Sequence, residues 1–209
     1  MTAIAGRLVL AAAMVASVTA QTAKPAAKWI SLFDGKSLKD WKETPFTKHG
    51  PVLVRDAMIV IGAGNLSGVT LARDFPKSGY EIQFEAARLD GNDFFAGITF
   101  PVGQSFCTWI NGGWGGSVVG LSSLDDDDAS ENDTSTAREF VKGRWYAFRL
   151  AVTAERIQGW IDGNLVIDAD IKGRKVGLRP GEMDLSTPVG FATYWTQAGL
   201  RKIEYRLMQ

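Results

Sequence analysis

The side chains best suited to chemistry lie in two stretches, 92–114 and 125–132. Trp114 sits in a glycine-rich run, and an indole face stacks well on the apolar face of a pyranose ring. Neighbouring amide and carboxylate groups can fix the hydroxyls of such a ring. We therefore select candidate site residues that would gather on one concave face: Asn92, Asp93, Asn111, Trp114, Asp128, Glu131 and Asn132.

Four tryptophans extend this interpretation, because each has a glycine-rich, strand-edge or polar neighbourhood. They are Trp109, Trp114, Trp160 and Trp195. Plain core packing is the alternative for any one of them, since large aromatic side chains dominate protein cores. The pattern favours a protein that binds carbohydrate, with at least some of these four tryptophans at the protein surface.

An acidic run covers residues 122–136 and is too polar and self-repelling for a strand. It is either a solvated loop, a rim of carboxylates above a sugar site, or a set of oxygen ligands for a divalent cation such as Ca²⁺. The spacing of an EF-hand is absent. We therefore leave a divalent cation open, assign no metal ligand and predict no other cofactor.

Glu81 and Glu85 are the first pair to test for glycoside hydrolysis, because both point to one face of an expected strand. Four residues at about 3.3 Å each separate their α-carbons by roughly 13 Å. Glycosidases that retain configuration need carboxyl groups about 5–5.5 Å apart, and inverting ones about 6.5–9.5 Å apart. The pair is better interpreted as an outward polar face.

Strand patterns fill the chain beyond residue 28. Residues 80–86 alternate, with Ile82, Phe84 and Ala86 on one face. Residues 94–100 are expected to form the returning strand, whereas the glycines of 109–116 argue against a regular strand there.

Later segments show the same patterns. Residues 145–152 alternate, residues 156–161 and 165–169 form a hairpin across Asp162-Gly163-Asn164, and 189–195 and 202–207 make closing strands, with Leu207 facing inward. No sustained helical period appears outside the leader. The expected fold is all-β: a sandwich, or jelly roll, of two antiparallel sheets.

The N-terminus has the pattern of a secretory leader. Arg7 precedes an apolar run shorter than the ~20 residues of a membrane span, and Val18-Thr19-Ala20 offers a cleavage site. We predict a signal peptide at 1–20, a linker at 21–28, one domain at 29–209, and a secreted or periplasmic protein without a membrane span. A membrane anchor is the alternative.

Composition excludes several function classes. Loss of Arg7 with the leader changes the charge to 22 − 23 = −1, which favours neither nucleic acid nor an anionic membrane as partner. His49 is the single histidine and Cys107 the single cysteine. Serine, cysteine and zinc mechanisms that need several histidines are therefore disfavoured.

Several motifs together resemble a known family. WISLFDGKSLKDW opens at Trp29, YEIQFEAARLDGNDFFAGITFPVG follows at Tyr80, GRWYAFRLAVTAERIQGWIDG begins at Gly143, and LRKIEYRLM closes the chain. In this order they resemble the 3-keto-disaccharide hydrolase domain family, and GGWGGSVVGLSSLDDDDASEN is similar to a subgroup common in exported bacterial proteins. The resemblance implies a concanavalin A-like β-sandwich and, in some members, cleavage of glycosides oxidised at carbon 3.

The chemistry that this resemblance implies is an elimination, because a ketone at C3 acidifies the neighbouring C2 proton. A general base, a group that polarises the ketone and an acid for the leaving oxygen are needed. Asp93 or Glu131 is the candidate base, and Trp114 would stack on the sugar. Two other functions stay open: a carbohydrate-binding module without catalysis, and an interaction domain of the cell envelope. The oligomeric state is not assigned.

Overall fold

The computed structural model describes residues 27–208. The expected signal peptide and most of the expected linker therefore lie outside the described residues. Within the described part, fifteen strands and one short 3₁₀ helix, η1 (Met183–Ser186), follow one another along the chain. None of the helical segments in this part is long and apolar enough to span a membrane.

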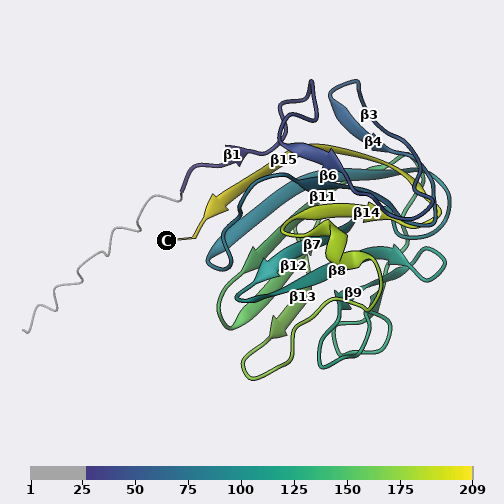
Figure 1. The fold of residues 1–209 in the computed structure, drawn as a ribbon. Coiled ribbons are helices and arrows are strands. Elements are labelled where there is room, and N and C mark those ends of the chain that lie inside the picture. The colour runs from purple at the N-terminus through teal and green to yellow at the C-terminus, as the bar shows by residue number, and fades with distance from the viewer. Residues whose placement is uncertain (1–26, 209) are drawn as a thin grey trace, which may run out of the picture.

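Two antiparallel sheets stack as two layers (Figure 1). The first sheet has the order β13 (Asn164–Asp170), β12 (Arg156–Ile161), β11 (Trp145–Val152), β6 (Tyr80–Asp90), β15 (Gln197–Leu207), β4 (Met58–Ile61) and β3 (Val52–Arg55), with β1 (Ile30–Ser31) paired to β15. The second sheet has the order β10 (Thr136–Ala137), β9 (Val118–Ser122), β8 (Ser105–Gly113), β7 (Gly97–Val102), β14 (Gly190–Thr193), β5 (Ser67–Leu71) and β2 (Trp41–Glu43). The expected two-sheet sandwich is confirmed.

Aromatic side chains between the layers form the centre of the core. Phe84 on β6 stacks on Phe148 of β11, with ring centroids 4.9 Å apart and planes 7° from parallel. Phe84 also meets Phe191 of the opposite sheet edge-on at 4.8 Å. The period-2 alternation of β6 and β11 places every second residue in this layer, as the sequence predicts.

The tight turn of the β12–β13 hairpin also agrees with the sequence. Ile161 pairs with Asn164 across Asp162-Gly163. Asp162 and Gly163 both have positive φ, at 51° and 78°, as a two-residue hairpin turn requires. The predicted hairpin is confirmed, with its second strand beginning one residue earlier than expected.

Three local expectations need correction. β8 runs through Trp109 to Gly113 despite the glycines, because a register shift between Asn111 and Gly113 absorbs the irregular backbone as a bulge. β7 begins only at Gly97, because Asp93 to Ala96 belong to the turn. Leu207, expected to face inward, is 52% exposed because β15 leaves the core at its end.

Cys107 lies on β8 with its side chain fully buried between the layers. Burial raises the pKa of its thiol to about 12, although the carbonyls of Thr108 and Ser122 lie close to the sulfur. The thiol is therefore protonated at neutral pH. Cys107 therefore behaves as a small buried hydrophobe.

Replacing Phe84 with alanine should destabilise the fold strongly, because the ring contacts both sheets. We expect the free energy of unfolding to fall by about 3–5 kcal/mol in urea titrations. Val141→Ala, at a side chain that is 60% exposed, is the control and should change it by less than about 0.5 kcal/mol. Equal effects of the two substitutions would contradict the placement of the core.

Candidate functional site

A cavity of about 390 Å³ opens on the outer face of the second sheet. Thr108 and Ile110 of β8 and Ser122 of β9 form its floor, on the face of the strands that alternates with the core residues Cys107 and Trp109. The remaining lining comes from loops: Leu66, Asp93, Phe94, Trp114, Asp128, Arg179, Pro180, Gly181, Glu182, Met183 and Tyr194.

Asp128 lies at the polar side of the cavity. Its Oδ1 accepts hydrogen bonds from the Ser122 hydroxyl at 2.5 Å and from the Ala129 amide at 2.8 Å. Its Oδ2 lies 2.8 Å from a guanidinium nitrogen of Arg179. The carboxylate is only 15% exposed, whereas the Arg179 side chain is 60% exposed, so the carboxylate is the fixed member of this pair.

Arg179 joins the acidic and aromatic parts of the cavity. Its guanidinium carbon lies 5.8 Å from the centroid of the Trp114 ring, within the range of cation–π attraction. The same guanidinium pairs with Asp128. An indole face, a carboxylate and an exposed cation thus meet in one place, although they come from three different loops.

The turn that carries Trp114 has a left-handed backbone. Trp114 itself has φ 48°, and Gly112 and Gly116 have φ 80° and 119°. Asp93 fixes this turn from one side: its Oδ2 accepts the Gly115 amide at 2.9 Å, and its Oδ1 accepts the amide of Phe94. Both oxygens of Asp93 are therefore used to hold backbone.

Arg88 fixes the same turn from below. Its buried guanidinium donates to the carbonyl oxygens of Gly116 at 3.0 Å and Gly112 at 3.3 Å, and at 3.4 Å to that of Phe140. Burial lowers the pKa of this guanidinium, while the negative charge of Asp93 acts in the opposite direction. A Cβ at Gly112 would lie 2.5 Å from the guanidinium, so the close approach requires glycine.

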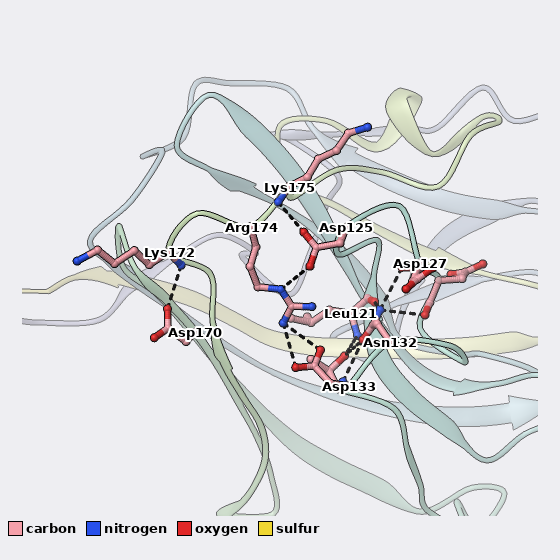
Figure 2. Close-up of polar contacts among 11 residues, drawn as sticks. Leu121, Asp125, Asp127, Asn132, Asp133, Asp170, Lys172, Arg174 and Lys175 are labelled. Atoms are coloured by element: carbon pink, nitrogen blue, oxygen red, sulfur yellow. Dashed lines mark hydrogen bonds and ion pairs between the residues drawn. The ribbon is translucent and has the colours of Figure 1, made fainter.

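The acidic run is held by a basic loop, residues 172–179 (Figure 2). Arg174 bonds Asp125 at 2.8 Å and Asp133 at 2.9 Å, and the Lys175 amide donates to Asp125. The Lys175 ammonium pairs with Asp126. The run is therefore an exposed loop that is tied to its basic neighbour by ion pairs: the side chains of Asp125, Asp126 and Asp133 stay 48%, 72% and 69% exposed. No group of three or more His, Cys, Asp or Glu side chains in residues 27–208 is arranged to hold a metal ion.

The structure brings three of the seven candidate residues to the cavity: Asp93, Trp114 and Asp128. Asn92 is exposed on the turn beside it, and Glu131 is exposed with its carboxylate 3.4 Å from the Asp128 amide. Neither of these two lines the cavity.

The other two candidates are buried. Asn111 faces the core side of β8 and donates to the Ala96 carbonyl at 2.9 Å. The Asn132 amide donates to the carbonyl of Leu121 on β9 at 2.7 Å and to the carbonyls of Asp127 and Asp128 in its own loop (Figure 2). Both side chains hold backbone in place.

The four tryptophans separate into different environments. Trp109 is fully buried in the core, and Trp160 lies on the first sheet, where its ring centroid is 3.9 Å from the Arg149 guanidinium carbon. Trp195 is 56% exposed and meets Tyr194 edge-on at 6.3 Å. Trp114 is thus the one of the four that lines the cavity.

Sequence reasoning missed Arg179, Tyr194 and Met183. The 172–181 stretch is recognisable as a basic loop, and its charge is complementary to that of the acidic run. That complementarity was the available indication that the two loops meet. Nothing in the local sequence distinguishes Tyr194 or Met183 from core residues.

With this geometry established, comparison with known proteins identifies the family. The sequence profile of the 3-keto-alpha-glucoside-1,2-lyase-like domain matches residues 28–206. The chain belongs to this family. The lyase-like domain is therefore a carbohydrate-active domain by class, and the resemblance seen in its motifs is confirmed. Among curated proteins, none matches it in sequence.

Solved structures similar to the lyase-like domain share its fold. A Bacillus subtilis protein of unknown function with a galectin-like fold has a TM-score of 0.61 and 9% identity, covering 89% of this chain and 98% of that one. A laminarinase from Flavobacterium sp. UMI-01 has a TM-score of 0.56 and 12% identity, and the match covers 88% of this chain and 100% of the laminarinase chain. A Bacillus subtilis carbohydrate-binding module of family CBM66 has a TM-score of 0.55 and 13% identity, and the match covers 80% of this chain and 95% of the module. At these identities the likeness shows the fold alone.

Acid should weaken the attachment of the two charged loops. The Lys175 amide and the Arg174 guanidinium lower the pKa of Asp125 from its usual 3.8. A lowered pKa in the folded state means that this contribution to stability is present above 3.8 and is lost as the pH falls through the folded pKa. Asp125→Asn should therefore lower the Tm at pH 7, and the difference from wild type should shrink in acid.

Thermal unfolding of both proteins at several pH values down to about 2.5 checks this expectation. Asp74→Asn, at an exposed aspartate outside both loops, is the control and should show no such convergence. A Tm difference for Asp125→Asn that stays constant over the whole pH range would contradict the role given to this ion pair.

Proposed function

We propose that this domain eliminates the aglycone from α-glucosides that carry a ketone at carbon 3. Family membership supports the substrate class. The observation that carries the proposal is the meeting of Asp128, Arg179 and Trp114 in one cavity of about 390 Å³. This volume lies within the range of small-molecule sites, about 300–1,000 Å³.

The ketone determines what the side chains must do. It acidifies the proton on C2, so that a carboxylate can remove this proton while the negative charge moves to the C3 oxygen. The C1–O bond then breaks, a double bond forms between C1 and C2, and the departing oxygen takes a proton from water. The hydroxide that remains takes the C2 proton from the carboxyl group, which restores the carboxylate. The products are the free aglycone alcohol and an unsaturated 3-keto sugar.

We assign the base to Asp128 rather than to Asp93 or Glu131. Both oxygens of Asp93 accept backbone amides, and Glu131 lies outside the cavity lining. Asp128 faces the cavity, and its Oδ1 is fixed by Ser122 and Ala129. Its Oδ2, held by the exposed Arg179 alone, is the atom that would accept the C2 proton.

Arg179 is the group that stabilises the developing oxyanion. Its guanidinium already lies between Asp128 and the Trp114 ring, and its exposure lets it turn from the carboxylate to the substrate. A positive charge placed beside an enolate oxygen lowers the barrier to its formation. Movement of this cation would at the same time free Oδ2 of Asp128.

Sugar binding without catalysis is the second candidate function. The observation in its favour is that every carboxylate oxygen of Asp93 and Asp128 has a hydrogen-bond or ion-pair partner in this structure. In that case Trp114 would stack on the sugar and the carboxylates would shape the cavity. This function predicts saturable binding of 3-keto-glucosides with no product over hours.

Asp128→Asn should abolish turnover while binding persists. The product enone absorbs in the near ultraviolet, so elimination from a 3-keto-α-glucoside can be followed directly. Loss of the general base should lower kcat by about 10²- to 10⁴-fold, whereas KM should change less, because the amide keeps the shape of the side chain.

The matched control is Asp126→Asn in the same loop, where the carboxylate pairs with Lys175 and does not line the cavity. Its turnover should stay within about twofold of wild type. Wild-type turnover that survives in Asp128→Asn would overturn the assignment of the base. Binding without any turnover by the wild type would instead select the non-catalytic function.

We also propose that the protein is exported, on the strength of its first twenty residues. Expression of the full chain in a bacterial host should yield a mature form that begins after Ala20. N-terminal sequencing of the periplasmic or secreted fraction measures this, and replacement of Leu8 to Leu10 by charged residues should retain the precursor in the cell. An unprocessed, membrane-bound chain would favour the anchor.

A further inference from the structure

The lining of the cavity divides into a polar side and an apolar wall. The polar side consists of Thr108, Ser122, Asp128 and Arg179, which are joined to one another by strand pairing and by side-chain contacts. We define the apolar wall as Leu66, Phe94, Ile110, Met183 and Tyr194. Of these five side chains, only Tyr194 carries a polar atom.

Strand order in the second sheet separates these two groups. Thr108, Ser122 and Asp128 belong to β8, β9 and the loop that follows β9, at one side of the sheet, and Arg179 comes from the basic loop that pairs with Asp128. Phe94 precedes β7, Tyr194 follows β14 and Leu66 precedes β5, so these three lie at the same end of three neighbouring strands. The topology therefore separates these three residues from Ser122 and Asp128, while Ile110 lies on β8 two residues from Thr108.

Four of the five residues of the apolar wall pack together. Phe94 and Leu66 pack with Met183 in the smaller of the two hydrophobic clusters. Phe94 and Tyr194 stack with centroids 6.0 Å apart and planes 17° from parallel. Glu182 also lines the cavity, but both of its oxygens accept hydrogen bonds from Thr47. Little hydrogen-bonding capacity faces a ligand on this side.

We infer that the leaving group accepted by this cavity is a flat aromatic aglycone rather than a second sugar. A sugar ring stacked on the apolar wall would still lose water from its hydroxyls without gaining hydrogen-bond partners, and each buried unpaired polar group is costly. An aromatic ring loses nothing of this kind and stacks on Tyr194 and Phe94. The glucosyl ring would occupy the polar side, so the inference rests on the proposed function for its orientation.

Two ligands with the same α-glucosyl half and no ketone test this inference without turnover. Phenyl α-glucoside carries an aromatic aglycone, and maltose carries a second glucose. Calorimetric titration of the full-length protein should show phenyl α-glucoside binding at least tenfold more tightly than maltose. Equal affinities, tighter binding of maltose, or no binding of phenyl α-glucoside would each overturn the inference.

Substitutions in the apolar wall test whether its residues cause the preference for phenyl α-glucoside. Tyr194→Ala should weaken phenyl α-glucoside about fivefold or more and change maltose less than twofold, and Tyr194→Phe should keep the preference because the ring remains. Leu66→Asn is a second variant with the same expected direction. Trp160→Ala, on the first sheet, is the control and should alter neither affinity. A loss of preference in Trp160→Ala, or none in Tyr194→Ala, would place the aglycone elsewhere.

The aglycone preference and the elimination reaction can each fail without the other in these experiments. Binding preference for the phenyl glucoside with no turnover of its 3-keto form would leave the aglycone site standing and remove the lyase function. Turnover of 3-keto-maltose with a lower KM than that of 3-keto phenyl glucoside would leave the lyase function standing and remove the aglycone site.

Discussion

The site depends above all on the electrostatic pairing of two loops of opposite charge. An exposed ion pair contributes little by itself, about 0–1 kcal/mol. Here Arg174 forms ion pairs with two aspartates, and Lys175 and Arg179 form further ion pairs between the same two loops. Because one loop carries Asp128 and the other carries Arg179, the ion pair in the cavity forms only where these loops are joined.

A second constraint lies beneath the Trp114 turn. Arg88 is a buried cation whose hydrogen bonds go to carbonyl oxygens, and its Nε has no partner among the described residues. Asp93 lies on the other side of the turn. Its negative charge raises the pKa of Arg88 without a direct hydrogen bond between the two side chains. The turn is thus held between a cation below and a carboxylate beside it, which explains how a tryptophan is kept at positive φ.

Much of the fold followed from period-2 alternation, because a two-layer core imposes it on every central strand. The sequence could not reveal the strand through Trp109 to Gly113, since a bulge there is a property of the pairing with β9 and not of the glycines themselves. Asp93, Trp114 and Asp128 were recognisable because reactive side chains stood among glycines and acids. Arg179 and Tyr194 were not, because only the sheet order and the loop pairing bring them to the same cavity.

The buried, protonated thiol of Cys107 has a practical consequence. Maleimides and other thiol-directed reagents attack the accessible thiolate, and a thiol with a pKa of about 12 at zero exposure provides almost none. The native wild-type protein therefore does not react with such labels. A cysteine introduced at the rim of the cavity would be the sole reactive position, so a spectroscopic probe can be attached there without removing the natural residue.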